Sequence, residues 1–531
     1  MTQKIINKWA QEFTNVNNMN SNFSELYSNF TELDANVPPA IDSLVVVAAG
    51  DSITDGGWYT ASGTTGAATG SGTIGTLIGF GPQLLVLAGS SIYIAGFNQP
   101  EWNGVKTVLT NNGTNITFTN ATTLTAAPTS SLFIVTADGI QTNRNFLKQA
   151  NGLMGLPFSR IYNRAISGST STTVLVRFAD VIALRPNYIW LMIGINDINA
   201  TVPNTTIIAN IQACCAQALN IKATVLLSTL LPSTAAGITT AMKKQILALN
   251  GLIRKYAQQT AGIILIDSYQ YAGDPLSATY AWKVAGHTID GVHLTGYGAT
   301  NTVTKAIFDQ LNTKIGRPKK SLVAHGEDSY IADSTSQNLF YDPLVLNTLT
   351  SAITGFTGTG GTGNPVYHYF MRPARITGTP SASIGVVARA DGFGNDQTVT
   401  ITSTANNDIM SIGGSTNNWL DAPFTAAVGK TVKFKCAFSQ TGVPVGTLAG
   451  MSLYVVTPNG MYYCIYGQSG SFVLANENSA DMDTIIEGTP FVVPTGFPTG
   501  NGTSFNVLLK FAGNAAGAVF KFGRLSIDIL N

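Results

Sequence analysis

Charged residues are scarce in this chain: Asp, Glu, Lys and Arg make up 11% of its 531 residues, against about a quarter in ordinary globular proteins. The 29 basic and 28 acidic side chains nearly cancel, which leaves a formal net charge of +1. A chain without a basic or acidic field does not attract nucleic acid or an anionic membrane surface. We therefore expect no nucleic-acid partner and no membrane partner.

Cysteine is also rare, with four residues in all. Cys214 and Cys215 are adjacent, Cys436 and Cys464 lie far along the chain, and no spacing typical of a zinc site occurs. We expect four buried thiols and no metal or cofactor, with a Cys436 to Cys464 disulfide as the open alternative. The sequence has no apolar run of about 18 residues or more and no signal peptide at residues 1–4.

Residues 1–38 carry a heptad pattern that ends at two prolines. Apolar side chains repeat at two heptad positions: Val16, Phe23, Phe30 and Val37 at the first, and Met19, Leu26 and Leu33 at the second. Such a repeat predicts a coiled coil for oligomerisation or attachment. Because large aromatic side chains would crowd a two-stranded seam, we expect a homotrimer. A single amphipathic helix lying on its own domain is the alternative.

Residues 41–315 alternate between apolar strands and amphipathic helices, the order that gives a parallel sheet with helices on both faces. We therefore predict a three-layer α/β/α domain. Its first strand is the apolar run at residues 45–49, which Gly50 ends. Residues 60–140 interrupt the alternation with short β-type runs and Asn-Gly turns. We expect a small inserted β-module there, which would contact substrate or another subunit.

The rest of the chain has a different character. Residues 316–344 are predicted to be a linker. Helical periodicity is absent from residues 345–531, where short strands separated by Gly, Asn and Pro turns predict a β-sandwich, such as a jelly roll. We expect this C-terminal domain to bind carbohydrate or to support trimerisation.

Four turns of the predicted α/β domain carry polar residues. They are Gly50-Asp51-Ser52, Ser167-Gly168, Gly194-Ile195-Asn196-Asp197 and Asp290-Gly291-Val292-His293. Because parallel strands end along one edge of a sheet, we expect these turns to converge. Taken alone, Gly-Asp-Ser is a common turn in which the polar side chains bond the backbone. The four turns together supply the parts that acyl transfer requires.

Ser52 is the candidate nucleophile. A serine hydroxyl is weakly nucleophilic and needs a base, usually a neutral histidine that a carboxylate orients. His293 and Asp290, three residues apart, are the candidate base and its carboxylate. The developing oxyanion needs fixed donors. The backbone amides of Ser52 and Gly168 and the side-chain amide of Asn196 are the candidates for this oxyanion hole.

These four blocks, in this order, resemble the SGNH (GDSL-type) hydrolase family, whose motifs are a Gly-Asp-Ser block, a single-glycine block, a Gly-x-Asn-Asp block and an Asp-x-x-His block. The resemblance spans residues 44–312 and implies the same roles for the five residues just named. Two features depart from the family pattern: the insertion at residues 60–140 stretches the spacing, and Ile53 replaces leucine after the serine.

Other polar residues have simpler interpretations. His287 lies on the same loop as His293, and we expect it on the cleft wall or the surface, with the role of base as the alternative. Asp267 could line the cleft from the end of a strand. Structural roles are expected for Asp51, Asp197, His325 and His368.

The resulting prediction is a serine esterase that removes an acyl group, above all acetyl, from a carbohydrate. The heptad, the missing signal peptide and the C-terminal β-domain resemble bacteriophage tail fibres or tailspikes. This resemblance implies location on the virion, a host surface polysaccharide as substrate, and a phage tail or baseplate protein bound through the N-terminus. A lipase or thioesterase of the same family, or a receptor-binding protein with an idle hydrolase domain, are the alternatives.

Overall fold

The computed structural model describes most of residues 44–315 and 345–529. The longest internal gaps are at residues 81–90, where only Val86 is described, and at 414–420, 465–480 and 494–503. The predicted coiled coil at residues 1–38 and the predicted linker at 316–344 lie outside the described residues. No helix in the described part of the chain has the length and apolar character needed to cross a membrane.

The predicted α/β region contains a five-stranded parallel sheet. Its strands are β1 (Val45–Gly50), β9 (Arg160–Asn163), β10 (Tyr188–Met192), β11 (Thr224–Ser228) and β12 (Ile263–Ile266). The strand order is β12-β11-β10-β1-β9, and every neighbouring pair is parallel. The central strands are continuous apolar runs because helices cover both faces of such a sheet.

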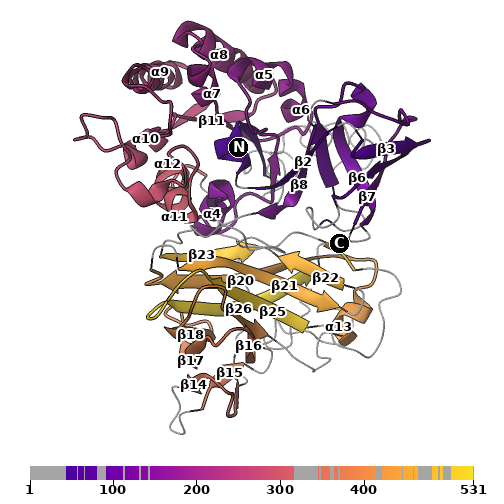
Figure 1. The fold of residues 1–531 in the computed structure, drawn as a ribbon, viewed down its shortest axis with the longest axis vertical. Coiled ribbons are helices and arrows are strands. Elements are labelled where there is room, and N and C mark those ends of the chain that lie inside the picture. Colours follow the sequence, from indigo (N-terminus) through magenta and orange to yellow (C-terminus); the bar gives the residue numbers. More distant parts are fainter. Residues whose placement is uncertain are drawn as a thin grey trace, which may run out of the picture. The chain divides into compact units, whose positions relative to one another are not determined.

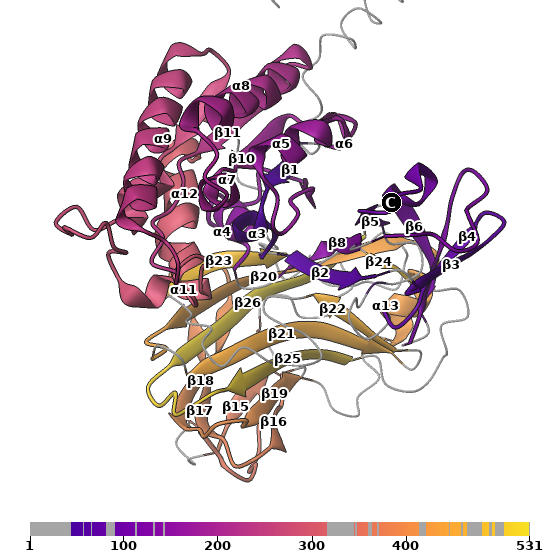
Figure 2. The same cartoon turned by 45° about the horizontal axis from the view of Figure 1, so that its top comes forward.

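The helices form two groups, which Figures 1 and 2 show on opposite sides of the sheet. One group consists of α5 (Ser171–Val176), α6 (Phe178–Ile182), α7 (Ile195–Asn199), α8 (Asn204–Asn220) and α9 (Thr240–Gln259). The other consists of α4 (Phe146–Leu153), α10 (Ser268–Ala272), α11 (Gly296–Ala299), the π-helical turn η5 (Thr300–Thr304) and α12 (Lys305–Leu311). A parallel sheet between two helical layers is the predicted α/β architecture.

One predicted helix is divided in two. The apolar pattern of residues 174–184 predicts a single helix, but α5 ends at Val176 and α6 begins at Phe178. The residue between them, Arg177, has φ −98° and ψ 9°, which is outside the helical region. Its guanidinium bonds the backbone carbonyl of Gly50, so a tertiary contact decides the backbone here.

The strand order reverses beside β1. From β1 the chain runs to β9 on one side, and it then crosses to β10 on the other side. In open α/β sheets such a reversal leaves a crevice at the carboxyl ends of the two strands, which is where ligands bind. Gly50 is paired with Met192 at these ends. The turns that follow β1 and β10 are therefore neighbours, although they are far apart in sequence.

Gly50 is required by this close approach. A Cβ atom at Gly50 would lie 2.5 Å from the carbonyl oxygen of Met192 and 2.7 Å from Oγ1 of Thr54. Real Cβ atoms do not come so close to backbone atoms, so any side chain at this position would push β1 and β10 apart.

The inserted region forms its own antiparallel sheet of seven strands. These are β2 (Trp58–Gly63), β3 (Ala68–Ser71), β4 (Ile74–Leu77), β5 (Ser91–Ala95), β6 (Gly104–Asn111), β7 (Ile116–Thr119) and β8 (Phe133–Gln141). A separate hydrophobic core fills it, in which Phe97 stacks on Phe133 and Trp102 meets Phe118 edge-on. Because it has its own core, this segment is a module rather than an extension of the parallel sheet.

The C-terminal region is built of strands, with one short helix, α13 (Asp421–Ala426), among the described residues. One sheet contains β14 (Phe356–Gly358), β17 (Ser381–Ala388), β18 (Asn395–Ser403), β26 (Val519–Ile529), β20 (Thr431–Thr441), β23 (Met482–Glu487) and β24 (Phe491–Val492). A second contains β16 (Pro373–Thr377), β19 (Ile409–Gly413), β25 (Ser504–Phe511), β21 (Leu448–Thr457) and β22 (Gly460–Cys464). The strands β13 (Thr348–Thr350) and β15 (Val366–His368) pair separately.

Side chains from both larger sheets contribute to one hydrophobic core. Phe434 and Phe520 come from the first sheet, and Met410 and Leu509 from the second; all four are fully buried. The more specific prediction of a jelly-roll-like sandwich stays a prediction.

Candidate active site

Ser52 lies at the crevice between β1 and β10. It is the first residue of the short helix α3 (Ser52–Asp55), two residues beyond the end of β1. The preceding residue, Asp51, caps this helix, because its Oδ1 accepts a hydrogen bond from the amide of Ile53 at 3.0 Å. The serine hydroxyl is left to face another loop: its Oγ lies 2.8 Å from Nε2 of His293.

His293 is held by Asp290 in the loop before α11. Nδ1 of His293 lies 2.6 Å from Oδ2 of Asp290. The other carboxylate oxygen, Oδ1, accepts the backbone amides of Val292 at 2.9 Å and His293 at 2.8 Å. Partial burial raises the pKa of Asp290, but the hydrogen bonds from His293 and the two amides outweigh it and lower the pKa to about 2. The carboxylate is therefore charged at neutral pH and keeps Nε2 of the ring turned toward the serine.

The loop that carries Asp290 and His293 is fixed at Gly291. The Gly291 carbonyl accepts the amide of Thr234 at 2.9 Å and Nε1 of Trp282 at 3.2 Å. Its φ of +90° favours glycine, and a Cβ there would lie 2.4 Å from the backbone nitrogen of Ala235. Sequence reasoning missed Thr234 and Trp282, because neither forms part of a motif.

Of the predicted oxyanion donors outside the serine turn, Gly168 lies in a loop and Asn196 in the first turn of α7. Gly168, with φ +78°, lies in an exposed stretch. Within the described residues, neither the amide of Ser52 nor that of Gly168 has a hydrogen-bond acceptor. Nδ2 of Asn196 donates to the carbonyl of Ser169 at 2.9 Å, which leaves its second N–H available. No direct contact joins Gly168 or Asn196 to the Ser52 side chain.

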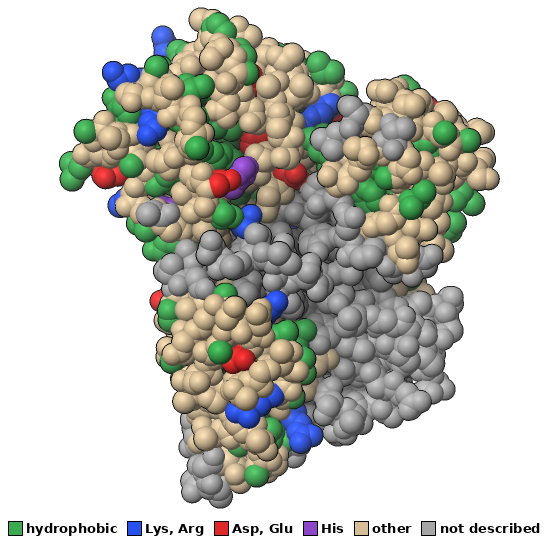
Figure 3. All heavy atoms as spheres, in the orientation of Figure 1, with side chains coloured by type: hydrophobic (Ala, Val, Ile, Leu, Met, Phe, Trp, Pro, Cys, Tyr) green, Lys and Arg blue, Asp and Glu red, His purple; other side chains and the backbone are tan. Residues whose placement is uncertain are grey.

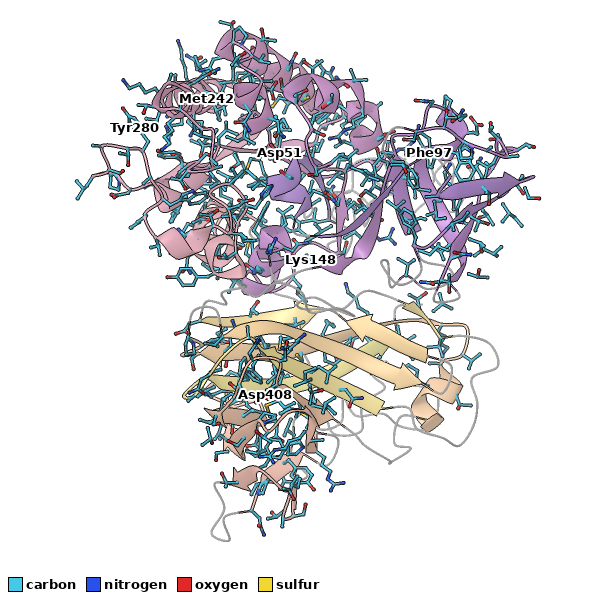
Figure 4. The ribbon with its side chains drawn as sticks, in the orientation of Figure 1. Asp51, Phe97, Lys148, Met242, Tyr280 and Asp408 are labelled. Carbon is cyan, nitrogen blue, oxygen red and sulfur yellow. The ribbon has the colours of Figure 1, made fainter. Side chains whose placement is uncertain are left out.

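Three carboxylates of this region are buried, and two of them, Asp51 and Asp197, bond backbone amides as expected. Asp197 accepts the amide of Ser171 at 2.8 Å and its hydroxyl at 2.7 Å. Asp55 accepts Nδ2 of Asn163 at 2.9 Å. Asp51, labelled in Figure 4, is fully buried, and its Oδ2 has no partner. Burial, with the nearby charges of Asp197 and Asp55, raises the pKa of Asp51 to about 7.

His287 differs from its predicted place on the cleft wall or the surface. It is buried, with its ring packed against Trp282 and Tyr297. Burial, helped by the charge of Lys283, lowers the pKa of His287 to about 4. Its neighbours in the sequence are polar and small, so nothing local predicted this burial. The histidine that contacts Ser52 is His293.

The remaining candidates take no part in this arrangement. Asp267 forms a two-point ion pair with Arg254, with N to O distances of 2.8 and 2.9 Å. His368 lies in β15, and His325 lies outside the described residues. Cys214 is a buried thiol whose pKa burial raises to about 12. Among the residues that the structure describes, no cluster of side chains could hold a metal ion.

The site is open to solvent. The side chains of His293 and Asp290 are 37% and 51% exposed. Figure 3 shows histidine and carboxylate atoms side by side on the visible face of the α/β region.

Residues 131–300 match the sequence model of the GDSL-like lipase/acylhydrolase family. This α/β region is a GDSL-type hydrolase domain. The matched range contains Gly168, Asn196, Asp290 and His293 and begins after Ser52, which the inserted module separates from the rest of the domain. Acylhydrolase chemistry in the family implies that the GDSL-type domain is an ester hydrolase.

Solved structures are similar to part of this chain at low identity. A GDSL-like lipase from Bacteroides thetaiotaomicron is 20% identical, with a TM-score of 0.30 over 54% of this chain and 98% of that one. A catalytic mutant of an acetylxylan esterase from Geobacillus stearothermophilus is 15% identical, with a TM-score of 0.30 over 52% of this chain and 95% of that one. None of the curated proteins matches this chain. The family match and the geometry of the site are therefore the observations that bear on function.

The raised pKa of Asp51 predicts how stability depends on pH. The folded protein favours the neutral form of the Asp51 carboxyl. Asp51 therefore contributes its full stabilisation of the fold below 3.8, the ordinary pKa of an aspartate, and this contribution is lost as the pH rises through about 7. The melting temperature of the wild type should fall by several degrees, on the order of 5 °C, between about pH 5 and 8. In Asp51→Asn this fall should be much smaller.

Thermal melts followed by circular dichroism measure this effect. Glu101→Gln is the matched control: the hydrogen bond from Thr125 holds the pKa of this carboxyl below its ordinary value, so its removal should leave the change of melting temperature between about pH 5 and 8 as it is in the wild type. If the melting temperature of Asp51→Asn falls with pH as steeply as that of the wild type, Asp51 does not titrate in this range.

Proposed function

We propose that this protein is a serine esterase that removes an acyl group, above all acetyl, from a carbohydrate. The observation that carries the proposal is the continuous hydrogen-bonded chain from Ser52 Oγ through His293 to Asp290, with distances of 2.8 and 2.6 Å. Nucleophile, base and orienting carboxylate are in contact, as acyl transfer by a serine requires.

In the proposed reaction, Ser52 Oγ attacks the ester carbonyl carbon while His293 Nε2 takes the hydroxyl proton. The carbonyl oxygen becomes an oxyanion, toward which the unbonded amides of Ser52 and Gly168 and the second N–H of Asn196 supply hydrogen bonds. The tetrahedral intermediate collapses, and His293 gives its proton to the departing alcohol. Water then attacks the acyl-serine by the same steps, which releases the acid and restores Ser52.

The openness of the site supports a carbohydrate alcohol. His293 delivers its proton to the leaving alcohol, so the exposed ring marks the side on which the bulk of the substrate lies. A hydrated polymer suits such an open surface, whereas a long acyl chain would need an apolar cleft that shields it from water. The small acetyl group needs no such cleft.

The proposal extends to the biological setting. We propose that the substrate is an O-acetylated capsule or lipopolysaccharide on a host cell, and that the chain is part of a phage tail. The support comes from the sequence: the heptad of residues 1–38 suits a homotrimeric stalk attached to a tail or baseplate protein, and the low charge and frequent glycines resemble virion proteins.

Replacement of the nucleophile tests the esterase proposal. Ser52→Ala should abolish acetate release from acetylated bacterial surface polysaccharides, measured by an enzymatic acetate assay, while the melting temperature stays within a few degrees of wild type. His287→Gln, which alters the histidine that does not contact Ser52, should keep activity if it remains folded. Polysaccharide binding by the wild type with no acetate release would indicate an idle hydrolase domain, and release of fatty acids alone would indicate a lipase.

Asn196 tests the oxyanion hole separately. Asn196→Ala should lower kcat on the order of 10²- to 10³-fold, because one preorganised donor is lost. Asn196→Asp keeps the size of the side chain but replaces the donor with an acceptor, so it should be at least as slow. Steady-state kinetics on an acetyl ester measure both. A kcat within about twofold of wild type in Asn196→Ala would remove this residue from the oxyanion hole.

The trimer proposal is tested by sedimentation equilibrium. The full chain should sediment at three times its monomer mass of 55.9 kDa, and a chain lacking residues 1–38 should lose this association. A monomeric full-length protein at micromolar concentration would contradict the proposed stalk.

A further inference from the structure

Arg177 connects the two loops that carry the proposed backbone donors. Its guanidinium donates from Nη2 to the carbonyl of Gly50 at 3.2 Å and to Oγ of Ser169 at 2.7 Å, and from Nη1 to the carbonyl of Arg164. Gly50 ends the strand before Ser52, while Arg164 and Ser169 flank Gly168. One side chain therefore pins the glycine loop, residues 163–170, against the serine turn.

The glycine loop is also held from the inserted module. Tyr93, in β5, is buried, and the guanidinium carbon of Arg164 lies 4.4 Å from the centre of its ring. The hydroxyl of Tyr93 donates to Oδ2 of Asp180 at 2.6 Å. Asp180 lies in α6, which begins directly after Arg177. Tyr93 thus contacts both the glycine loop and the helix that positions Arg177.

The middle of the glycine loop has little packing of its own. Ser167 and Gly168 are exposed, and no atom lies within 4 Å of a Cβ built at Gly168. Where a loop lacks packing, its position depends on the anchors at its two ends. Here Arg164 and Ser169 are two of those anchors, and Arg177 contacts both of them. A third is the amide of Ile166, which donates to the carbonyl of Gly50 at 3.2 Å.

We propose that Tyr93 and Arg177 are positioning residues for the oxyanion hole, so that the inserted β-module completes the active site from a distance. The module would then act on the rate of the chemical step, rather than on substrate binding or on subunit contact as the sequence suggests. This inference rests on the proposed esterase function. A displacement of a donor by about 1 Å can cost on the order of 10²-fold in rate, which is enough to make the effect measurable.

Two substitutions at Tyr93 separate its contacts. Tyr93→Phe removes the hydrogen bond to Asp180 but keeps the ring against Arg164, whereas Tyr93→Ala removes both. We expect kcat on an acetyl ester to fall about 3- to 10-fold in the first and about 10- to 100-fold in the second, with KM within about twofold of wild type. Arg177→Lys keeps the charge but cannot reach three acceptors, and it should resemble Tyr93→Ala.

Two control variants match these changes. Tyr271→Phe removes a hydrogen bond of the same kind and length: Tyr271, in α10, donates its hydroxyl to Asp309, in α12, at 2.6 Å, and neither residue belongs to the glycine loop. Val108→Ala weakens the core of the module without touching Tyr93's partners. Both should keep the wild-type kcat at a temperature where the melting curve shows a folded protein. A raised KM with unchanged kcat in Tyr93→Ala would instead assign the module to substrate contact and overturn the proposal.

Hydrogen exchange tests the same inference without any turnover. In Tyr93→Ala, amides of residues 163–170 should exchange at least about tenfold faster than in the wild type, whereas Tyr271→Phe should leave them unchanged. Unchanged exchange in this segment would overturn the positioning role even if the wild type is an active esterase. Faster exchange in Tyr93→Ala, together with a wild type that hydrolyses no ester, would reject the proposed function and keep the mechanical link.

Discussion

In the parallel pairing of β1 with β10, the carbonyl of Met192 approaches Gly50 so closely that no side chain fits there. This pairing places the turn after β1 and the turn after β10 side by side at the point where the strand order reverses. Ser52 belongs to the first turn and Asn196 to the second. The loop with Asp290 and His293 comes from much later in the chain, and the Ser52 to His293 hydrogen bond joins it to the serine turn. The site therefore depends first on how tightly two strands pack.

A second pairing, that of β2 with β8, explains how the domain tolerates a large insertion beside its serine. The module enters through β2 and leaves through β8, and these two strands are antiparallel partners. Its two ends therefore lie close together, so the chain returns to α4 and β9 almost from where it left. Because the module has its own hydrophobic core, it does not need to pack side chains into the core of the parallel sheet. The cost of such an insertion is small, since loop closure depends only weakly on length.

Local sequence predicted those parts of the site that follow strands. Ser52 and Asn196 lie in the turns that directly follow β1 and β10, and a parallel sheet gathers such turns along one edge. Arg177, Thr234 and Trp282 were not predictable in this way. Each of them donates a hydrogen bond to a backbone carbonyl of another segment. Every residue has such a carbonyl, so the sequence does not show which one will be the acceptor. The burial of His287 was missed for a related reason, because its packing partners become neighbours only after the loop has folded.

The pKa values of two aspartates of the site are shifted in opposite directions, and the difference limits where positive charge can be stabilised. Asp51 is fully buried with one oxygen unpartnered, so burial raises its pKa to about 7. Asp290 is half exposed and accepts three hydrogen bonds, so its pKa falls to about 2. When a proton moves from Ser52 to His293, the imidazolium that forms needs a nearby negative charge. Of these two aspartates, only Asp290 bonds the ring directly. The buried carboxyl, kept largely neutral, shapes the turn and does not compete for that proton.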